Sequence, residues 1–210
     1  MSILIGVACQ HFGCLASDGL EVDINGHVVS KNTEKIVQIH STLAIGATGN
    51  RQIASAALTA ARFKASETFG RLRFDECVDA ACRAVTLLSK HPHKVKISPE
   101  TQIMILGVDT NQKFQIQAIT VEENFQLKST LLNQATGHSP VLIAPPPDIP
   151  HHSVYQEIAA IQNLVRRSNE PAVENEILDR VRQVVHSTAE MSRYVNNRCH
   201  LIHLKTTLDL

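Results

Sequence analysis

Short apolar runs separated by glycine and polar residues mark the first fifty residues of the chain. Residues 3–9 (ILIGVAC) are apolar, and a second such run at 14–17 follows Gly13. Runs of this length between turn residues predict β-strands. The pair Asn25-Gly26 is a hairpin signal, because both residues tolerate the positive φ angles of a tight turn. Further short strands are predicted at residues 28–29, 36–39 and 42–47.

The periodicity of the apolar positions changes after Asn50. Apolar residues then recur at the three- and four-residue spacing of an amphipathic helix over 53–65, and Gly70 marks its expected end. A second helix is predicted over 74–88, with Cys82 in its apolar stripe as a core thiol. Beyond these helices the pattern predicts strands at 103–108, 114–121 and 125–132, helices at 154–165 and 173–188, and a last strand at 198–204.

The order of these elements indicates the fold class. Helices are predicted in adjacent pairs, whereas a doubly wound parallel sheet alternates strands and helices. We therefore expect an α+β sandwich in which each helix pair covers one face of a β-sandwich. A length of 210 residues favours a single domain over 1–210. Within it, residues 89–100 form a polar loop and residues 144–150 (APPPDIP) form a Pro-rich connector.

The charge balance excludes several classes of partner. The chain has 20 Lys and Arg against 20 Asp and Glu, so its formal net charge is zero with neutral histidines. A general nucleic-acid or membrane-surface binder needs a basic excess. Aromatic residues make up only 4% and Trp is absent, which disfavours stacking on single-stranded nucleic acid. We therefore expect neither a nucleic-acid nor a membrane partner.

The five cysteines have no zinc-like spacing, and four of them lie inside apolar runs. This pattern is typical of reduced, buried thiols in a cytosolic protein. No apolar stretch reaches membrane-spanning length, and the first residues lack the features of a signal peptide. The sequence therefore predicts a cytoplasmic location.

Three polar residues stand where predicted strands begin or end. Ser2 becomes N-terminal if Met1 is removed, and a side chain as small as serine permits that removal. Its α-amino group then supplies a built-in base, with an unperturbed pKa of about 7.7–8.0. Asp18 follows the strand at 14–17, and Lys35 precedes the strand at 36–39. A lysine near the hydroxyl favours its deprotonated form and an aspartate orients that lysine, so the three residues form a candidate catalytic group.

These residues belong to a longer signature. Asp18 lies in Ala16-Ser17-Asp18-Gly19, Lys35 ends the segment VVSKNTEK, and a glycine turn follows at 44–49 (AIGATG). With Ser2, these segments resemble proteasome-type β-subunits, which are N-terminal nucleophile hydrolases. The chain is most similar to the bacterial HslV-like peptidases and the betaproteobacterial proteasome homologues, although its spacing from Asp18 to Lys35 is one residue longer. The segments 136–140 (TGHSP) and 194–202 (YVNNRCHLI) extend the likeness.

The resemblance implies a four-layer αββα sandwich and a role for each matching residue. Ser2 would attack a peptide carbonyl, its α-amine would carry the proton, and Asp18 would pair with Lys35 beside the hydroxyl. The backbone N–H of Gly49 would form the oxyanion hole. By the same resemblance, Ala47 and Val22 would line the substrate pocket, and Ser139, Glu190 and Ser192 would support the site.

The family also implies how such a subunit works. It would be a self-compartmentalizing endopeptidase of the threonine type, run here by serine, with no metal and no organic cofactor. Copies would assemble into stacked rings around an internal chamber. Peptides or unfolded proteins would be the substrates, and an ATP-dependent unfoldase would be a possible partner.

Departures from the family pattern leave other functions open. Ser2 replaces the usual threonine and lacks the methyl group that restricts its rotamer. The segment 20–23 (LEVD) replaces small polar residues that hold the substrate backbone in the family. A ring-forming subunit without activity and an N-terminal nucleophile amidase acting on small amides are the alternatives. Four histidines in Pro-flanked loops lack metal-ligand spacing and are expected at the surface: His91, His93, His151 and His152.

Overall fold

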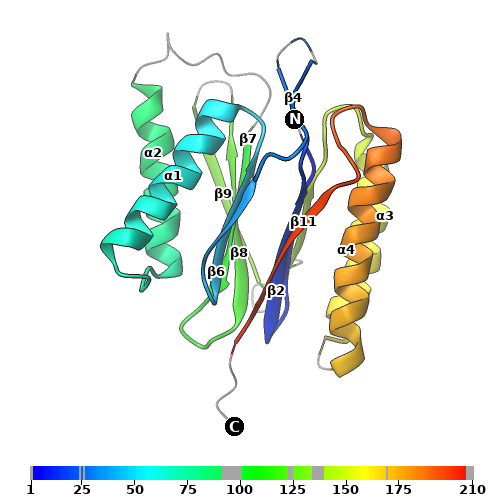
Figure 1. The fold of residues 1–210 in the computed structure, drawn as a ribbon. Helices are drawn as coiled ribbons and strands as arrows, with labels where there is room; N and C mark the ends of the chain where they lie inside the picture. The colour runs from blue at the N-terminus through cyan, green and yellow to red at the C-terminus, as the bar shows by residue number, and fades with distance from the viewer. Residues whose placement is uncertain are drawn as a thin grey trace.

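The computed structural model describes residues 2–23, 25, 27–90, 101–122, 125–133, 140–168 and 170–206, without the side chains of His151 and Pro171. Short strands alternate with pairs of helices along these residues (Figure 1). The elements are β1 (Leu4–Ala8), β2 (Phe12–Asp18), β3 (Glu21–Val22), β4 (Val28–Ser30), β5 (Ile36–His40), β6 (Leu43–Thr48), α1 (Arg51–Glu67), α2 (Phe74–Ser89), β7 (Thr101–Val108), β8 (Phe114–Val121), β9 (Leu127–Leu132), β10 (Val141–Ala144), α3 (His151–Val165), α4 (Pro171–Met191) and β11 (Cys199–Lys205).

Two antiparallel sheets contain most of the strands. One has the order β10-β1-β2-β11 and the other β5-β6-β7-β8-β9, while β3 and β4 form a separate hairpin. The first sheet joins the two ends of the chain, because β2 pairs with β1 on one side and with β11 on the other. The outer strands are therefore β10 and β11 in one sheet and β5 and β9 in the other.

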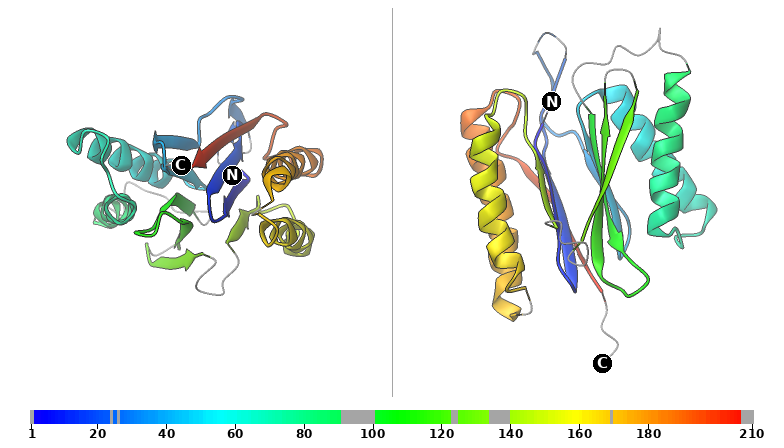
Figure 2. Two further views of the ribbon diagram at one scale, coloured as in Figure 1. Left: turned by 90° about the horizontal axis from the view of Figure 1, so that it is seen from below. Right: turned by 180° about the vertical axis from the view of Figure 1, so that it is seen from behind.

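Three apolar clusters hold the elements in layers. The cluster between the sheets includes Leu4, Leu15, Met104 and Ile116. A second cluster packs α1 and α2 onto the β5–β9 sheet, and a third packs α3 and α4 onto the other sheet. Figure 2 shows the helix pairs on opposite outer sides of the two sheets. Strands β1 and β2 are buried along their whole length because they are covered on both faces.

Local chemistry explains where the helices begin and end. The Asn50 side chain accepts hydrogen bonds from the N–H groups of Gln52 and Ile53, which caps α1. Beyond the end of α1, Gly70 has a φ of 76°, a conformation that favours glycine. On α4, Val173, Ile177 and Val181 recur every four residues and all are buried.

The predicted mixture of strands and paired helices is confirmed, with small shifts at the ends. The run at 141–144 forms β10, which the sequence pattern did not predict, so the connector to α3 begins after Ala144. Residues 91–100 of the predicted loop lie outside the described residues. None of the helices in the described part of the chain has the length and apolar character needed to cross a membrane.

The prediction of core thiols is also confirmed. All five cysteines are free, and Cys9, Cys14 and Cys77 are buried. Burial raises the pKa of Cys9 and of Cys77 to about 12. Cys82 is half-buried on α2, where burial likewise raises the pKa of its thiol. These thiols are poor nucleophiles because the thiolate form is disfavoured.

Candidate active site

The candidate site lies at one end of the two sheets, where the side chains of Ser2, Asp18 and Lys35 meet. Ser2 lies two residues before β1, and Asp18 is the last residue of β2. Lys35 directly precedes β5, which belongs to the other sheet. The site thus combines strand ends from both sheets. Lys35 contacts both Ser2 and Asp18 there, which is the grouping that the sequence predicts.

Lys35 donates hydrogen bonds to three oxygen atoms. Its Nζ lies 3.0 Å from Oδ1 of Asp18 and also contacts Oγ of Ser2 and the backbone oxygen of Leu20. An ammonium group has three N–H donors and no acceptor, so these oxygens satisfy it. The Ser2 hydroxyl in turn donates to the Leu20 carbonyl oxygen at 3.4 Å. The cation therefore lies directly against the candidate nucleophile.

The three side chains are almost closed to solvent. Relative exposure is 3% for Ser2, 0% for Asp18 and 8% for Lys35. Burial lowers the pKa of Lys35, because it disfavours the charged form, while the charges of Asp18 and Glu21 oppose that shift. A buried ion pair beside a hydroxyl creates a strong local field for any negative charge that develops on its oxygen.

Backbone N–H groups hold the Asp18 carboxylate in place. Oδ1 accepts from the N–H of Ile3 at 3.3 Å, and Oδ2 accepts from Leu20 at 2.7 Å and from Asn196 at 3.4 Å. These donors come from three separate segments, the start of β1, the turn after β2 and the segment before β11. Asp18 therefore orients Lys35 and also joins three segments around the site.

The glycine turn after β6 borders the same site. The Thr48 hydroxyl donates to the Ser2 carbonyl oxygen at 3.4 Å, and the Ala47 N–H donates to the Lys35 carbonyl oxygen at 2.9 Å. Ala47 is buried, and Gly49 has a φ of 108°, in the region that side chains disfavour. Val22 is half-buried in the β3–β4 hairpin. The structure thus ties Ala47 to the backbone of Lys35 and Thr48 to that of Ser2, two of the three predicted catalytic residues.

Asn196 is a supporting residue to which the sequence pattern assigned no role. Its Oδ1 accepts from the Gly19 N–H at 3.1 Å, and its Nδ2 donates to the Lys31 carbonyl oxygen at 3.0 Å. Its backbone N–H also donates to Asp18. The resemblance of residues 194–197 to the family pointed to this segment, but it did not predict the contacts of Asn196.

The supporting residues that the resemblance predicted have different surroundings. The Ser192 hydroxyl donates to Oδ1 of Asp148 at 2.7 Å, and the Arg193 N–H approaches Oδ2 of the same carboxylate at 3.3 Å. This pair ties the start of α3 to the end of α4. Glu190 is exposed near the end of α4, and Ser139 lies outside the described residues. Their predicted roles beside Ser2 stay predictions.

The described part of the chain contains no group of three His, Cys, Asp or Glu side chains that could hold a metal ion. Of the histidines considered from the sequence, His152 is exposed. His91, His93 and the His151 side chain lie outside the described residues.

A search of solved structures finds a fold of known type. The chain is similar to eukaryotic HslV from Trypanosoma brucei, with a TM-score of 0.60 and 13% identity, over 97% of this chain and 99% of that one. At this identity the match shows the fold, which is of the kind that the resemblance to proteasome-type β-subunits implied. No family model and no curated protein matches the chain.

Proposed function

We propose that this chain is an N-terminal nucleophile peptidase in which Ser2 attacks the peptide carbonyl once Met1 has been removed. The observation that carries the proposal is the buried Lys35 ammonium, which contacts the Ser2 hydroxyl and the Asp18 carboxylate together. The HslV-like fold supports the same reaction class. A fold alone does not imply an activity, so the proposal rests on the site.

In the proposed reaction, Ser2 Oγ bonds to the carbonyl carbon while the Ser2 α-amino group takes the hydroxyl proton. The tetrahedral intermediate then collapses, the C–N bond breaks and that proton passes to the leaving amine. The acyl group remains on Ser2 as an ester, and water hydrolyses it to restore the hydroxyl. Lys35 assists the first step because a buried cation favours negative charge on the neighbouring oxygen.

The oxyanion is proposed to accept a hydrogen bond from the Gly49 backbone N–H. Gly49 follows Thr48, which is hydrogen-bonded to the Ser2 carbonyl, so this N–H belongs to a segment already fixed to the nucleophile. Its φ of 108° requires glycine, and that conformation sets the direction of the peptide group. Such a preorganised donor stabilises charge that develops only in the transition state.

The substrates are proposed to be peptides or unfolded proteins, with Ala47 and Val22 lining the pocket for the substrate side chain. The small Ala47 leaves room in that pocket. By its likeness to proteasome-type subunits, the chain is further proposed to act as a single domain in a four-layer αββα fold. Copies of it would assemble into stacked rings around a chamber, with an ATP-dependent unfoldase as a possible partner.

Intact mass and covalent labelling test the proposal together. We expect the purified protein to lack Met1 and to take up one equivalent of a peptide epoxyketone, which reacts with both a hydroxyl and a free α-amine. Ser2→Ala should abolish labelling, whereas Ser66→Ala, at an exposed serine near the end of α1, should leave it unchanged. A Met1-free protein that does not label, or a labelled Ser2→Ala protein, would refute the mechanism.

The same measurements separate the alternatives. A chain that keeps Met1 has no α-amine on Ser2, and this result would identify a ring subunit without activity. A labelled enzyme that cleaves small acyl amides but not peptides would be an amidase. Cleavage of peptides by the Met1-free chain is the result that the proposal expects.

A further inference from the structure

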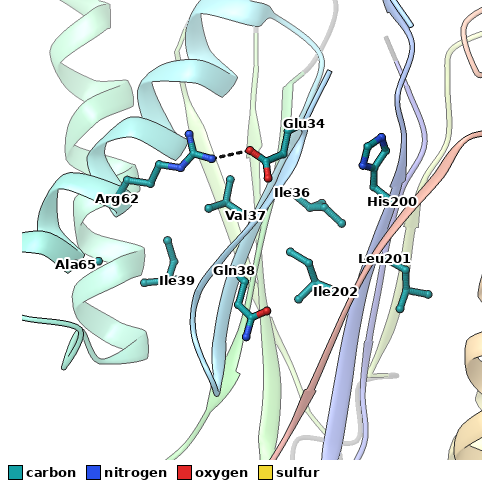
Figure 3. A pocket seen from close by; sticks show the side chains of 10 residues that line it. All are labelled: Glu34, Ile36, Val37, Gln38, Ile39, Arg62, Ala65, His200, Leu201 and Ile202. Carbon is teal, nitrogen blue, oxygen red and sulfur yellow. Dashed lines mark hydrogen bonds and ion pairs between the residues drawn. The ribbon is translucent and has the colours of Figure 1, made fainter. Parts of the chain in front are cut away.

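A cavity of about 560 Å³ lies beside β5, between α1 and β11 (Figure 3). Four successive residues of β5, 36–39, line it, which is the pattern of a strand edge. β5 is the outer strand of one sheet and β11 the outer strand of the other. The cavity therefore opens at strand edges that no other strand covers in the described part of the chain.

One end of the cavity carries a cation and an anion side by side. Arg62 of α1 and Glu34, just before β5, form an ion pair of 2.7 Å. Their side chains are 55% and 61% exposed. An exposed pair of this kind contributes little to stability, so a ligand with both charges can separate the two groups at small cost.

Mostly apolar side chains, with the exposed amide of Gln38 among them, line the rest of the cavity. Figure 3 shows Ile36, Val37, Ile39 and Ile202 below the Glu34–Arg62 pair, with Gln38 among them. His200 also lines the cavity, and its Nε2 is closed to solvent and has no hydrogen-bond partner among the described residues. The His200 Nε2 lies beside Gly19, so the lining that a ligand can reach combines a paired-charge end with a mainly apolar wall.

We infer that this cavity binds an α-amino acid with a large aliphatic side chain. Arg62 would bind its carboxylate, Glu34 its ammonium group, and the side chain would lie along the partly exposed Ile202. An α-amino acid carries both charges on one carbon, so it can replace the contact between Arg62 and Glu34 with one contact to each of them. A peptide separates its terminal charges along its backbone, and so fits this end less well. The volume is within the range of small-molecule sites.

This site is distinct from the candidate active site, although the two share strands. Lys35 lies between Glu34 and Ile36 in the chain, and His200 pairs with Ser17, the neighbour of Asp18. The Lys35 and Asp18 side chains themselves point to Ser2. The inference stands on the cavity and its charges, so it does not depend on the peptidase activity.

Calorimetric titration of the full chain with L-leucine tests the ligand class. We expect N-acetyl-L-leucine, which lacks the ammonium group, and L-leucinamide, which lacks the carboxylate, to bind at least about tenfold more weakly, the factor expected for one charge-assisted hydrogen bond. Glycine should also bind more weakly, because it lacks the side chain. Equal affinity for leucine and both blocked derivatives would overturn the inference, as would no leucine binding at all.

Variants locate the site. Arg62→Gln should weaken leucine binding about tenfold or more. Arg167→Gln is a matched control, because Arg167 forms an ion pair with Glu170 at 2.9 Å with side chains 54% and 56% exposed, away from the cavity. Ser2→Ala should leave binding unchanged. Binding lost with Ser2→Ala but kept with Arg62→Gln would assign leucine to the active site and overturn the inference. If leucine does not bind and Arg62→Gln changes the sedimentation of the protein, the charged pair belongs to a contact between copies of the chain. That result would also overturn the inference.

Discussion

Replacing Lys35 by methionine tests the electrostatics of the candidate active site most directly. Methionine keeps much of the aliphatic length of lysine and removes the charge. Asp18, which has no exposed surface, then loses the ammonium group 3.0 Å away. Breaking a buried pair by removing one partner costs about 3–5 kcal/mol. Because Asp18 keeps three backbone N–H donors, we expect the free energy of unfolding to fall by an amount near the lower end of this range, ~3 kcal/mol.

A double-mutant cycle measures this interaction by urea denaturation. Lys35→Met, Asp18→Asn and the double variant are compared with the native chain. In the double variant no buried charge is left without its partner. Its free energy of unfolding should therefore fall by ~2 kcal/mol less than the sum of the two single-variant decreases. Lys64→Met is the control, since Lys64 pairs with Glu67 at 3.0 Å with side chains 43% and 46% exposed. It should cost less than about 1 kcal/mol.

The cycle has a clear negative result. If the two single losses add within about 0.5 kcal/mol, Lys35 and Asp18 do not interact energetically, and the argument for a paired, oriented ammonium is wrong. Peptide hydrolysis by the same proteins gives a second measurement. We expect Lys35→Met to abolish hydrolysis and Lys64→Met to leave it unchanged.

Three further predictions concern the same site. Gly49→Ala should lower kcat by about 10²–10³, because alanine is strained at a φ of 108° and the N–H is displaced; steady-state peptide kinetics with unchanged kcat would contradict the oxyanion role. Asn196→Ala should destabilise the chain by about 1–3 kcal/mol in urea denaturation, because two backbone groups lose their partner, whereas the exposed Asn197→Ala should not. Burial lowers the pKa of Lys35 in the folded chain below its ordinary value of 10.5. At pH values between the lowered pKa and 10.5, the unfolded chain therefore binds more protons than the folded chain. Stability relative to Lys35→Met should therefore rise with pH across that window, and a flat difference would contradict the shift.

Local pattern predicted most of the elements because each depends on a short segment. The helix after Asn50 is an example, since its cap, its apolar period and Gly70 all lie within about twenty residues. β10 has only four residues, and it lies between Pro140 and the prolines at 145–147, so the local pattern does not separate it from a loop. Its strand character comes from pairing with β1 across more than 130 residues, and such pairing leaves no local signal.

The candidate active site was predictable because its residues occupy strand ends in a recognisable order. Ser2, Asp18 and Lys35 each adjoin an apolar run, so their placement follows from the strands. The contacts of Asn196 were not predictable, because they depend on how the segment before β11 lies against the turn at Gly19. The cavity beside β5 was not predictable for a similar reason, because its lining comes from three distant parts of the chain.

The apolar layer between the sheets sets the geometry of the candidate active site. A Cβ atom at Gly46 would lie 2.8 Å from side-chain carbons of both Leu4 and Ile36. Leu4 is two residues from Ser2, and Ile36 is next to Lys35. Any larger residue at position 46 must displace both of these side chains, each of which is close in the chain to a candidate catalytic residue. Gly46 thus sets how closely the side chains that follow Ser2 and Lys35 in the chain can pack, and the segment 44–49 acts through this packing as well as through Gly49.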